Sequence, residues 1–301
     1  MKRLTRYLAT AFLAAGLSHA AFAQSIAIKP GAGNVAGILI YDANIHTSGI
    51  GQYLARHPLP DGFNSSARQA LRTKVRSATL AHLKYKPPGG QPEIAIHARS
   101  GRSIEGTIEQ VKPRAPGETG SSTEAGEFVS STEEARDLAE AIYYPSDTPF
   151  SIRARNLTPQ DGWVVRPYPE ATGTVIHGAD AELKGLRTLE SKLIENPALR
   201  GGELTGYVSQ TVCHSCRRVF DDFAEEYGVH GNIYYLDEVA SDSASHQAAA
   251  ALKDARTKLA AGLARETTDA SYETERWATE YDADRIADAE VGSLTASEAC
   301  P

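Results

Sequence analysis

The chain has 301 residues, of which 41% are hydrophobic and 23% are charged, and its formal net charge is −7. This is an ordinary globular composition with room for one large or two smaller domains. The negative charge argues against bulk binding of nucleic acid.

The first 23 residues have the pattern of a secretory signal peptide. Basic residues at positions 2, 3 and 6 precede a short apolar run, and a small-x-small cleavage pattern ends at Ala23. Because the run is too short to span a bilayer, we expect a periplasmic or secreted protein with no integral membrane association after cleavage. Cleavage would leave 28 Lys and Arg against 38 Asp and Glu, a net charge of −10.

The first half of the mature chain predicts a separate N-terminal α+β accessory domain over 24–115. Its expected elements are a buried strand at 35–41, a basic amphipathic helix at 65–84, and short strands at 94–98 and 104–111. Residues 116–130 are rich in small and polar residues without apolar period, which predicts a linker.

Residues 51–114 carry eleven Lys and Arg against four Asp and Glu. The helix expected at 65–84 provides much of this positive charge. Its ordinary interpretation is a solvated helix face, and the alternative is a contact with nucleic acid or a membrane surface.

The second half alternates helices and strands. Its expected elements are a helix at 133–143, strands at 150–155 and 163–166, a helix at 179–194, a strand at 204–208, a helix at 213–227, a strand at 233–236 and a helix at 245–264. This order predicts an α/β sandwich with a mixed sheet over 131–264, followed by an acidic tail at 265–301.

Two short motifs in this half carry the chemistry. Asp180 and Glu182 begin one predicted helix, and Cys213 and Cys216 begin the next. Two thiolates and a third ligand can hold a zinc ion that keeps its fourth position open for water. A carboxylate two residues beyond the third ligand can move protons to and from that water. The pattern therefore favours a catalytic zinc site.

These residues resemble the cytidine-deaminase-like zinc superfamily, and within it the bacterial polymorphic-toxin deaminases. That superfamily has a ligand-x-Glu motif at the start of one helix and a Cys-x-x-Cys motif at the start of the next, with a strand between them. The segment 213–227, CHSCRRVFDDFAEEY, is the part most like the toxin branch. The likeness covers about residues 133–264.

The resemblance implies a cytidine-deaminase-like fold that binds Zn²⁺ through Cys213, Cys216 and Asp180. Glu182 would be the general acid and base. Asp180 stands where the family usually has His or Cys, so His177 is the alternative third ligand.

The implied activity is hydrolytic deamination of a nucleobase, cytosine more than adenine, in a nucleotide or nucleic acid. An exported toxin with an immunity protein as partner is the implied biological setting.

Two other interpretations remain open. A Cys-x-x-Cys at a helix start in an exported protein is also typical of thioredoxin-like thiol–disulfide oxidoreductases. Those enzymes place a proline loop downstream of the motif, and this chain has no proline from 198 to 300. The other alternative is a zinc-binding domain without catalytic activity.

Overall fold

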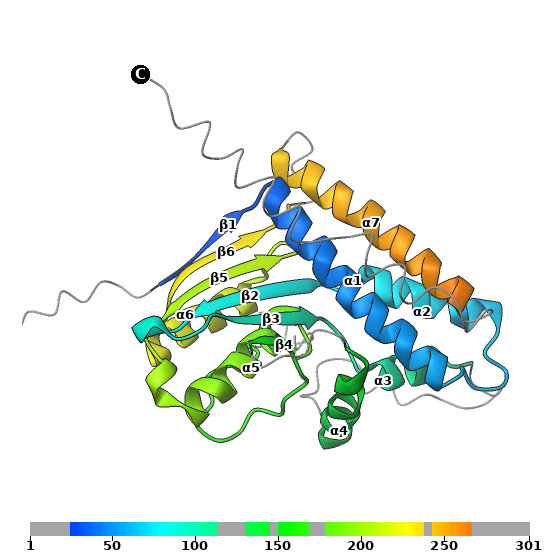
Figure 1. The fold of residues 1–301 in the computed structure, drawn as a ribbon, viewed down its shortest axis with the longest axis horizontal. Coiled ribbons are helices and arrows are strands. Elements are labelled where there is room, and N and C mark those ends of the chain that lie inside the picture. Colours follow the sequence, from blue (N-terminus) through cyan, green and yellow to red (C-terminus); the bar gives the residue numbers. More distant parts are fainter. Residues whose placement is uncertain (1–24, 114–129, 145–149, 169–177, 238–242, 267–301) are drawn as a thin grey trace, which may run out of the picture.

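The computed structural model of the chain describes residues 25–113, 130–144, 150–168, 178–237 and 243–266, which form an α/β fold (Figure 1). Within these ranges the α-helices are α1 (Gly33–Arg56), α2 (Ser65–Ser77), α3 (Ile104–Val111), α4 (Ser131–Ala139), α5 (Ala181–Glu195), α6 (His214–Tyr227) and α7 (Ala244–Glu266). The strands are β1 (Ile26–Pro30), β2 (Leu80–Lys86), β3 (Ile94–Arg99), β4 (Ser151–Arg153), β5 (Glu203–Val208) and β6 (His230–Tyr235). Short 3-10 turns occupy Pro88–Gly90, Glu140–Tyr143 and Pro197–Leu199.

The strands form one mixed sheet in the order β1-β6-β5-β2-β3-β4. The pairs β1–β6, β5–β6 and β3–β4 are parallel, whereas β2 is antiparallel to both β3 and β5. Helices α5 and α6 cover one face of this sheet, and α1 and α7 cover the other (Figure 1). The predicted α/β class with a mixed sheet is therefore confirmed.

The central strands are buried on both faces because each face carries a layer of helices. Successive side chains of a strand point to opposite faces. Leu83 of β2 and Ile96 of β3 accordingly lie in the core with Phe220 of α6. Leu80 of β2 lies in the other core with Leu39 of α1. This alternation decides which layer each polar side chain of β2 and β3 enters.

The predicted division between an accessory domain and a zinc domain does not divide the sheet. β2, from the first segment, is hydrogen-bonded to β5, from the second. Most of the predicted linker at 116–130 lies outside the described residues, as do the signal segment and the acidic tail beyond Glu266. Among the described residues, no helix combines the length and apolar character that a membrane span requires.

The strand predicted at 35–41 is wrong, because these residues belong to helix α1. The apolar run is continued by buried residues at helical spacing, among them Leu39, Ala43 and Ile50. The segment 104–111 is likewise helix α3 and not a strand. Its start is set by Ser103, whose hydroxyl accepts a hydrogen bond from the N–H of Gly106 at 3.0 Å, which is an N-cap.

The helix predicted at 65–84 ends at Ser77, and strand β2 begins at Leu80. Residues 81–86 alternate apolar and polar side chains, which is the period of a strand, and the helix predicted through residue 84 overlooks it. The strand predicted at 163–166 does not form. There the carboxylate of Glu190 accepts the N–H of Val164 at 2.7 Å, in the place of a partner strand.

The remaining predicted elements are confirmed with small shifts of their ends. They are β3, β4, β5, β6 and the helices α4, α5, α6 and α7, with the last turn predicted for α4 forming the 3-10 turn Glu140–Tyr143.

Helix α5 packs so closely on β2 that Gly185 of α5 leaves no room for a side chain. A Cβ at Gly185 would lie 2.7 Å from Cδ1 of Leu83, closer than packed atoms approach. We expect Gly185→Ala to lower the free energy of unfolding, because an overpacking cost of about 1–3 kcal/mol exceeds the gain in helix propensity of roughly 0.5–1 kcal/mol. Gly262→Ala on α7 is the matched control, because no atom lies within 4 Å of a Cβ there.

Urea unfolding of both variants measures the difference. Gly262→Ala should be at least as stable as the wild type. Equal stabilisation by the two substitutions would show that α5 does not pack this closely on β2.

Candidate metal centre

The thiol pair lies at the start of helix α6. Cys213 is the N-cap residue, and its Sγ accepts a hydrogen bond from the backbone N–H of Cys216 at 3.2 Å. Backbone N–H groups and the positive end of a helix are favourable partners for a thiolate. Cys216 is buried and Cys213 is half-buried, so the pair is reached from the side of Cys213.

Asp180 faces this pair from the start of helix α5. It occupies the N-cap position, yet its side chain makes no capping hydrogen bond. Instead Oδ2 accepts a hydrogen bond from the Cys216 thiol at a distance of 3.5 Å. One ligand atom from each of Asp180, Cys213 and Cys216 lies within 4.8 Å of the others. The structure therefore brings together three of the residues that the sequence analysis selected.

Glu182 lies in the first turn of α5 and is 4% exposed. Its charge acts on Cys216: the pKa of that thiol is raised by the hydrogen bond with Cys213, by burial, and by the carboxylates of Glu182 and Asp180. Several potential anions thus converge at one place. A bound cation would remove this repulsion, and two sulfur ligands with one carboxylate oxygen are a donor set that suits zinc.

Two buried charged residues of α5 fix the surroundings of the centre. Arg187 donates hydrogen bonds to the carbonyl oxygen of Gly178, two residues before Asp180, at 2.7 Å, and to that of Val165 at 3.2 Å. Burial lowers the pKa of Arg187 to about 10, against the opposing effect of Glu190. Glu190 in turn accepts the hydroxyl of Tyr227 on α6 at 2.8 Å. These bonds hold Gly178, just before α5, and Tyr227, at the end of α6, to the middle of α5.

The segment that ends at Tyr168 is anchored beside the thiol pair. The N–H of Tyr168 donates to the hydroxyl of Ser215, between the two cysteines, at 2.9 Å. The Tyr168 ring also stacks under Arg218, whose guanidinium carbon lies 3.8 Å from the ring centroid. His177, the alternative third ligand, lies outside the described residues.

The basic helix does not lie beside this centre. α2 packs with α1, α3 and α7, on the side of the sheet away from α5 and α6 (Figure 1). A polynucleotide contact on α2 would therefore be remote from Cys213 and Cys216.

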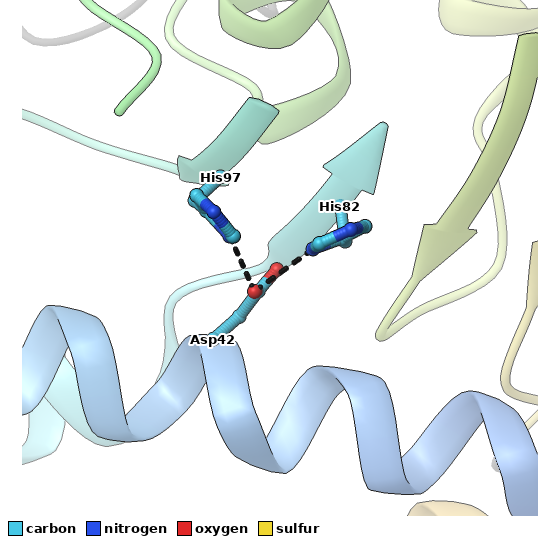
Figure 2. A group of neighbouring side chains, drawn as sticks. All are labelled: Asp42, His82 and His97. Atoms are coloured by element: carbon cyan, nitrogen blue, oxygen red, sulfur yellow. Dashed lines mark hydrogen bonds and ion pairs between the residues drawn. The ribbon is translucent and has the colours of Figure 1, made fainter. Parts of the chain in front are cut away.

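A second group of possible ligands lies on that other side of the sheet and was not predicted. Asp42 of α1 meets His82 of β2 and His97 of β3 (Figure 2). The sequence shows each histidine within an apolar segment, but it does not show the strand register that pairs them. Because residues 35–41 were predicted as a strand, the helix that carries Asp42 was not predicted either.

Comparison of the chain with protein-family models, with curated proteins and with solved structures finds no match. The resemblance to zinc deaminases thus rests on the motif residues Asp180, Glu182, Cys213 and Cys216. What the chain does is inferred from these residues and their geometry.

Proposed function

We propose that the chain is a zinc-dependent hydrolytic deaminase of a nucleobase, with cytosine in a nucleotide or nucleic acid as the favoured substrate. Cys213, Cys216 and Asp180 would hold the metal ion, and Glu182 would act as general acid and base. The cytidine-deaminase-like fold and the role as an exported toxin with an immunity partner belong to the same proposal.

One observation carries this proposal. Asp180 and the two cysteines come from the starts of different helices, and their ligand atoms nevertheless converge within 4.8 Å. Strand β5 lies between α5 and α6 in the chain, as the resemblance implies. Asp180 is the N-cap residue of α5, but its carboxylate makes no capping hydrogen bond and contacts the Cys216 thiol instead. This supports Asp180 as a metal ligand together with the two thiols.

The chemistry follows from the residues around that centre. Bound zinc supplies an activated water molecule, because the cation lowers the pKa of water toward neutrality. Glu182 would take a proton from the attacking water and pass protons to the ring nitrogen and the departing amine. Water and the amino-substituted base thereby give the carbonyl base and ammonia. Glu182 is buried, and its charge acts on Cys216, so a carboxylate lies next to the proposed metal ligands.

The thiol–disulfide alternative also has an observation in its favour. Cys213 accepts the N–H of Cys216, a bond that activates the first thiol of redox Cys-x-x-Cys motifs. The carboxylate of Asp180 at 3.5 Å from Cys216 acts against it, because a neighbouring negative charge disfavours the second thiolate. Metal analysis together with thiol titration separates the two activities.

The first prediction concerns metal retention. Cys213→Ser and Cys216→Ser should each lose zinc from the centre formed by α5 and α6 and unfold at lower denaturant concentration, because ligand loss also removes folding energy. Cys300→Ser is the matched thiol control and should keep the metal. Mass spectrometry of the native proteins and elemental analysis give the stoichiometry. Unchanged zinc in both motif variants would exclude the thiol pair as ligands.

The second prediction concerns catalysis. Glu182→Gln should keep the fold and the zinc but lose activity by ~10²–10⁴-fold, since the amide cannot accept the water proton. Glu195→Gln, on an exposed position of the same helix, is the matched control and should keep full activity.

Expression in the cytoplasm of a uracil-repair-deficient bacterium tests DNA cytosine as substrate. The wild-type mature chain should raise C-to-T changes, and Glu182→Gln should not. Ammonia release from cytidine and from RNA extends the assay to the other substrates. If the wild type and Glu182→Gln behave alike in every assay, the chain is not a deaminase of this type.

A further inference from the structure

We propose that Asp42, His82 and His97 form a second metal site, specific for a divalent transition-metal ion, between helix α1 and the sheet. It is independent of the thiol centre, because the two groups lie on opposite faces of β2 and β3. Zinc, cobalt and ferrous iron are the chemical class, since two imidazoles and one carboxylate suit these ions.

The strand register places the two histidines side by side. His82 of β2 is the cross-strand partner of His97 of β3 in the antiparallel pair. Both therefore point to the α1 face, opposite Leu83 and Ile96. The Nδ1 atoms lie 3.0 Å and 2.7 Å from the same atom, Oδ1 of Asp42 (Figure 2). Three side chains from three elements thus converge on one point.

The group is sealed from solvent and is not fully satisfied by hydrogen bonds. Asp42, His82 and His97 are 0%, 4% and 2% exposed. Among the described residues, Oδ2 of Asp42 and Nε2 of His82 have no hydrogen-bond partner. Leaving a buried polar atom unpaired costs roughly 1–3 kcal/mol, and more for a charged group. A cation beside the carboxylate would offset that cost for Oδ2 of Asp42.

The outer contacts also have the form of a metal site. Nε2 of His97 lies 2.8 Å from the hydroxyl of Ser151 on β4. A metal-binding histidine typically uses its second ring nitrogen in such a bond, which fixes the ring orientation and its tautomer.

A small polar cavity lies next along the same face. Arg99 and Leu80 form the cross-strand pair one step beyond the histidines, and His46 follows Asp42 by one helical turn. All three line the cavity, together with Arg76 and Arg256. Both ring nitrogens of His46 are buried without a hydrogen-bond partner in the described part of the chain. Asp42, His82 and His97 do not line this cavity, so it is a neighbouring space and not part of the proposed site.

The alternative is a metal-free hydrogen-bonded cluster in which both Nδ1–H groups donate to Asp42. It predicts folding without any metal and no change on metal addition. Metal binding by a variant that lacks the thiol centre distinguishes the two possibilities, because any metal bound there must occupy the second site. The experiment therefore uses the full mature chain carrying Cys213→Ser and Cys216→Ser, stripped with a chelator and titrated with Co²⁺ alone.

This double variant should bind one equivalent of Co²⁺. Its absorption spectrum should show ligand-field bands without a thiolate-to-cobalt charge-transfer band, and bound Co²⁺ should raise the thermal midpoint. Adding His82→Gln or His97→Gln should abolish binding. His230→Gln, an exposed histidine at the start of β6, is the matched control and should leave binding unchanged.

Ser151→Ala in the same background gives a test that does not remove a ligand. It should weaken Co²⁺ affinity by about 10–100-fold, the usual effect of losing the outer hydrogen bond of a ligating histidine. Circular dichroism confirms that each variant is folded. A folded double variant that binds no Co²⁺, or one whose binding survives His82→Gln, would overturn this site while leaving the thiol centre unaffected.

Discussion

The burial of β2 and β3 on both faces is the constraint on which the rest of the structure depends. With helices on either side, the residues of these strands other than the exposed Lys86 enter a packed layer, and the period of two assigns each to one layer or the other. Leu83 and Ile96 lie in the hydrophobic core that the sheet forms with α5 and α6. His82 and His97, one position away, must then enter the layer of α1. The position of both histidines in the layer of α1 is thus a consequence of one register.

The two proposed centres use different physics to bring their ligands together. At the thiol centre, the N-termini of two helices position the ligands. Asp180 and Cys213 are both N-cap residues, so the positive ends of α5 and α6 face the same small volume. At the other centre, adjacent strands align two imidazoles and a helix lays one carboxylate over them. The first centre is half-open and suits a reaction, whereas the second is enclosed and suits stabilisation of the α1–sheet contact.

The sequence predicts the elements of the second half well, because α5, α6 and β5 have clear periodicity and the cysteines mark a helix start. It fails for α1, since a buried apolar run has no period that separates helix from strand. It also misses β2, whose short alternating segment is joined to the helix predicted at 65–84. Three members of the thiol centre are visible as short motifs. Asp42, however, lies 40 residues from His82 and 55 from His97, and their contact depends on strand register and helix docking, which no local pattern encodes.

Strand β1 has a consequence for how the chain reaches its native state. It begins almost directly after the predicted cleavage site, yet it pairs in parallel with β6, and Lys29 contacts Asn232 across 203 positions. The first strand of the described residues therefore pairs with the last one. Contacts so distant along the chain slow folding. If the chain is exported, as we propose, a sheet that closes late keeps the polypeptide unfolded while it crosses the membrane.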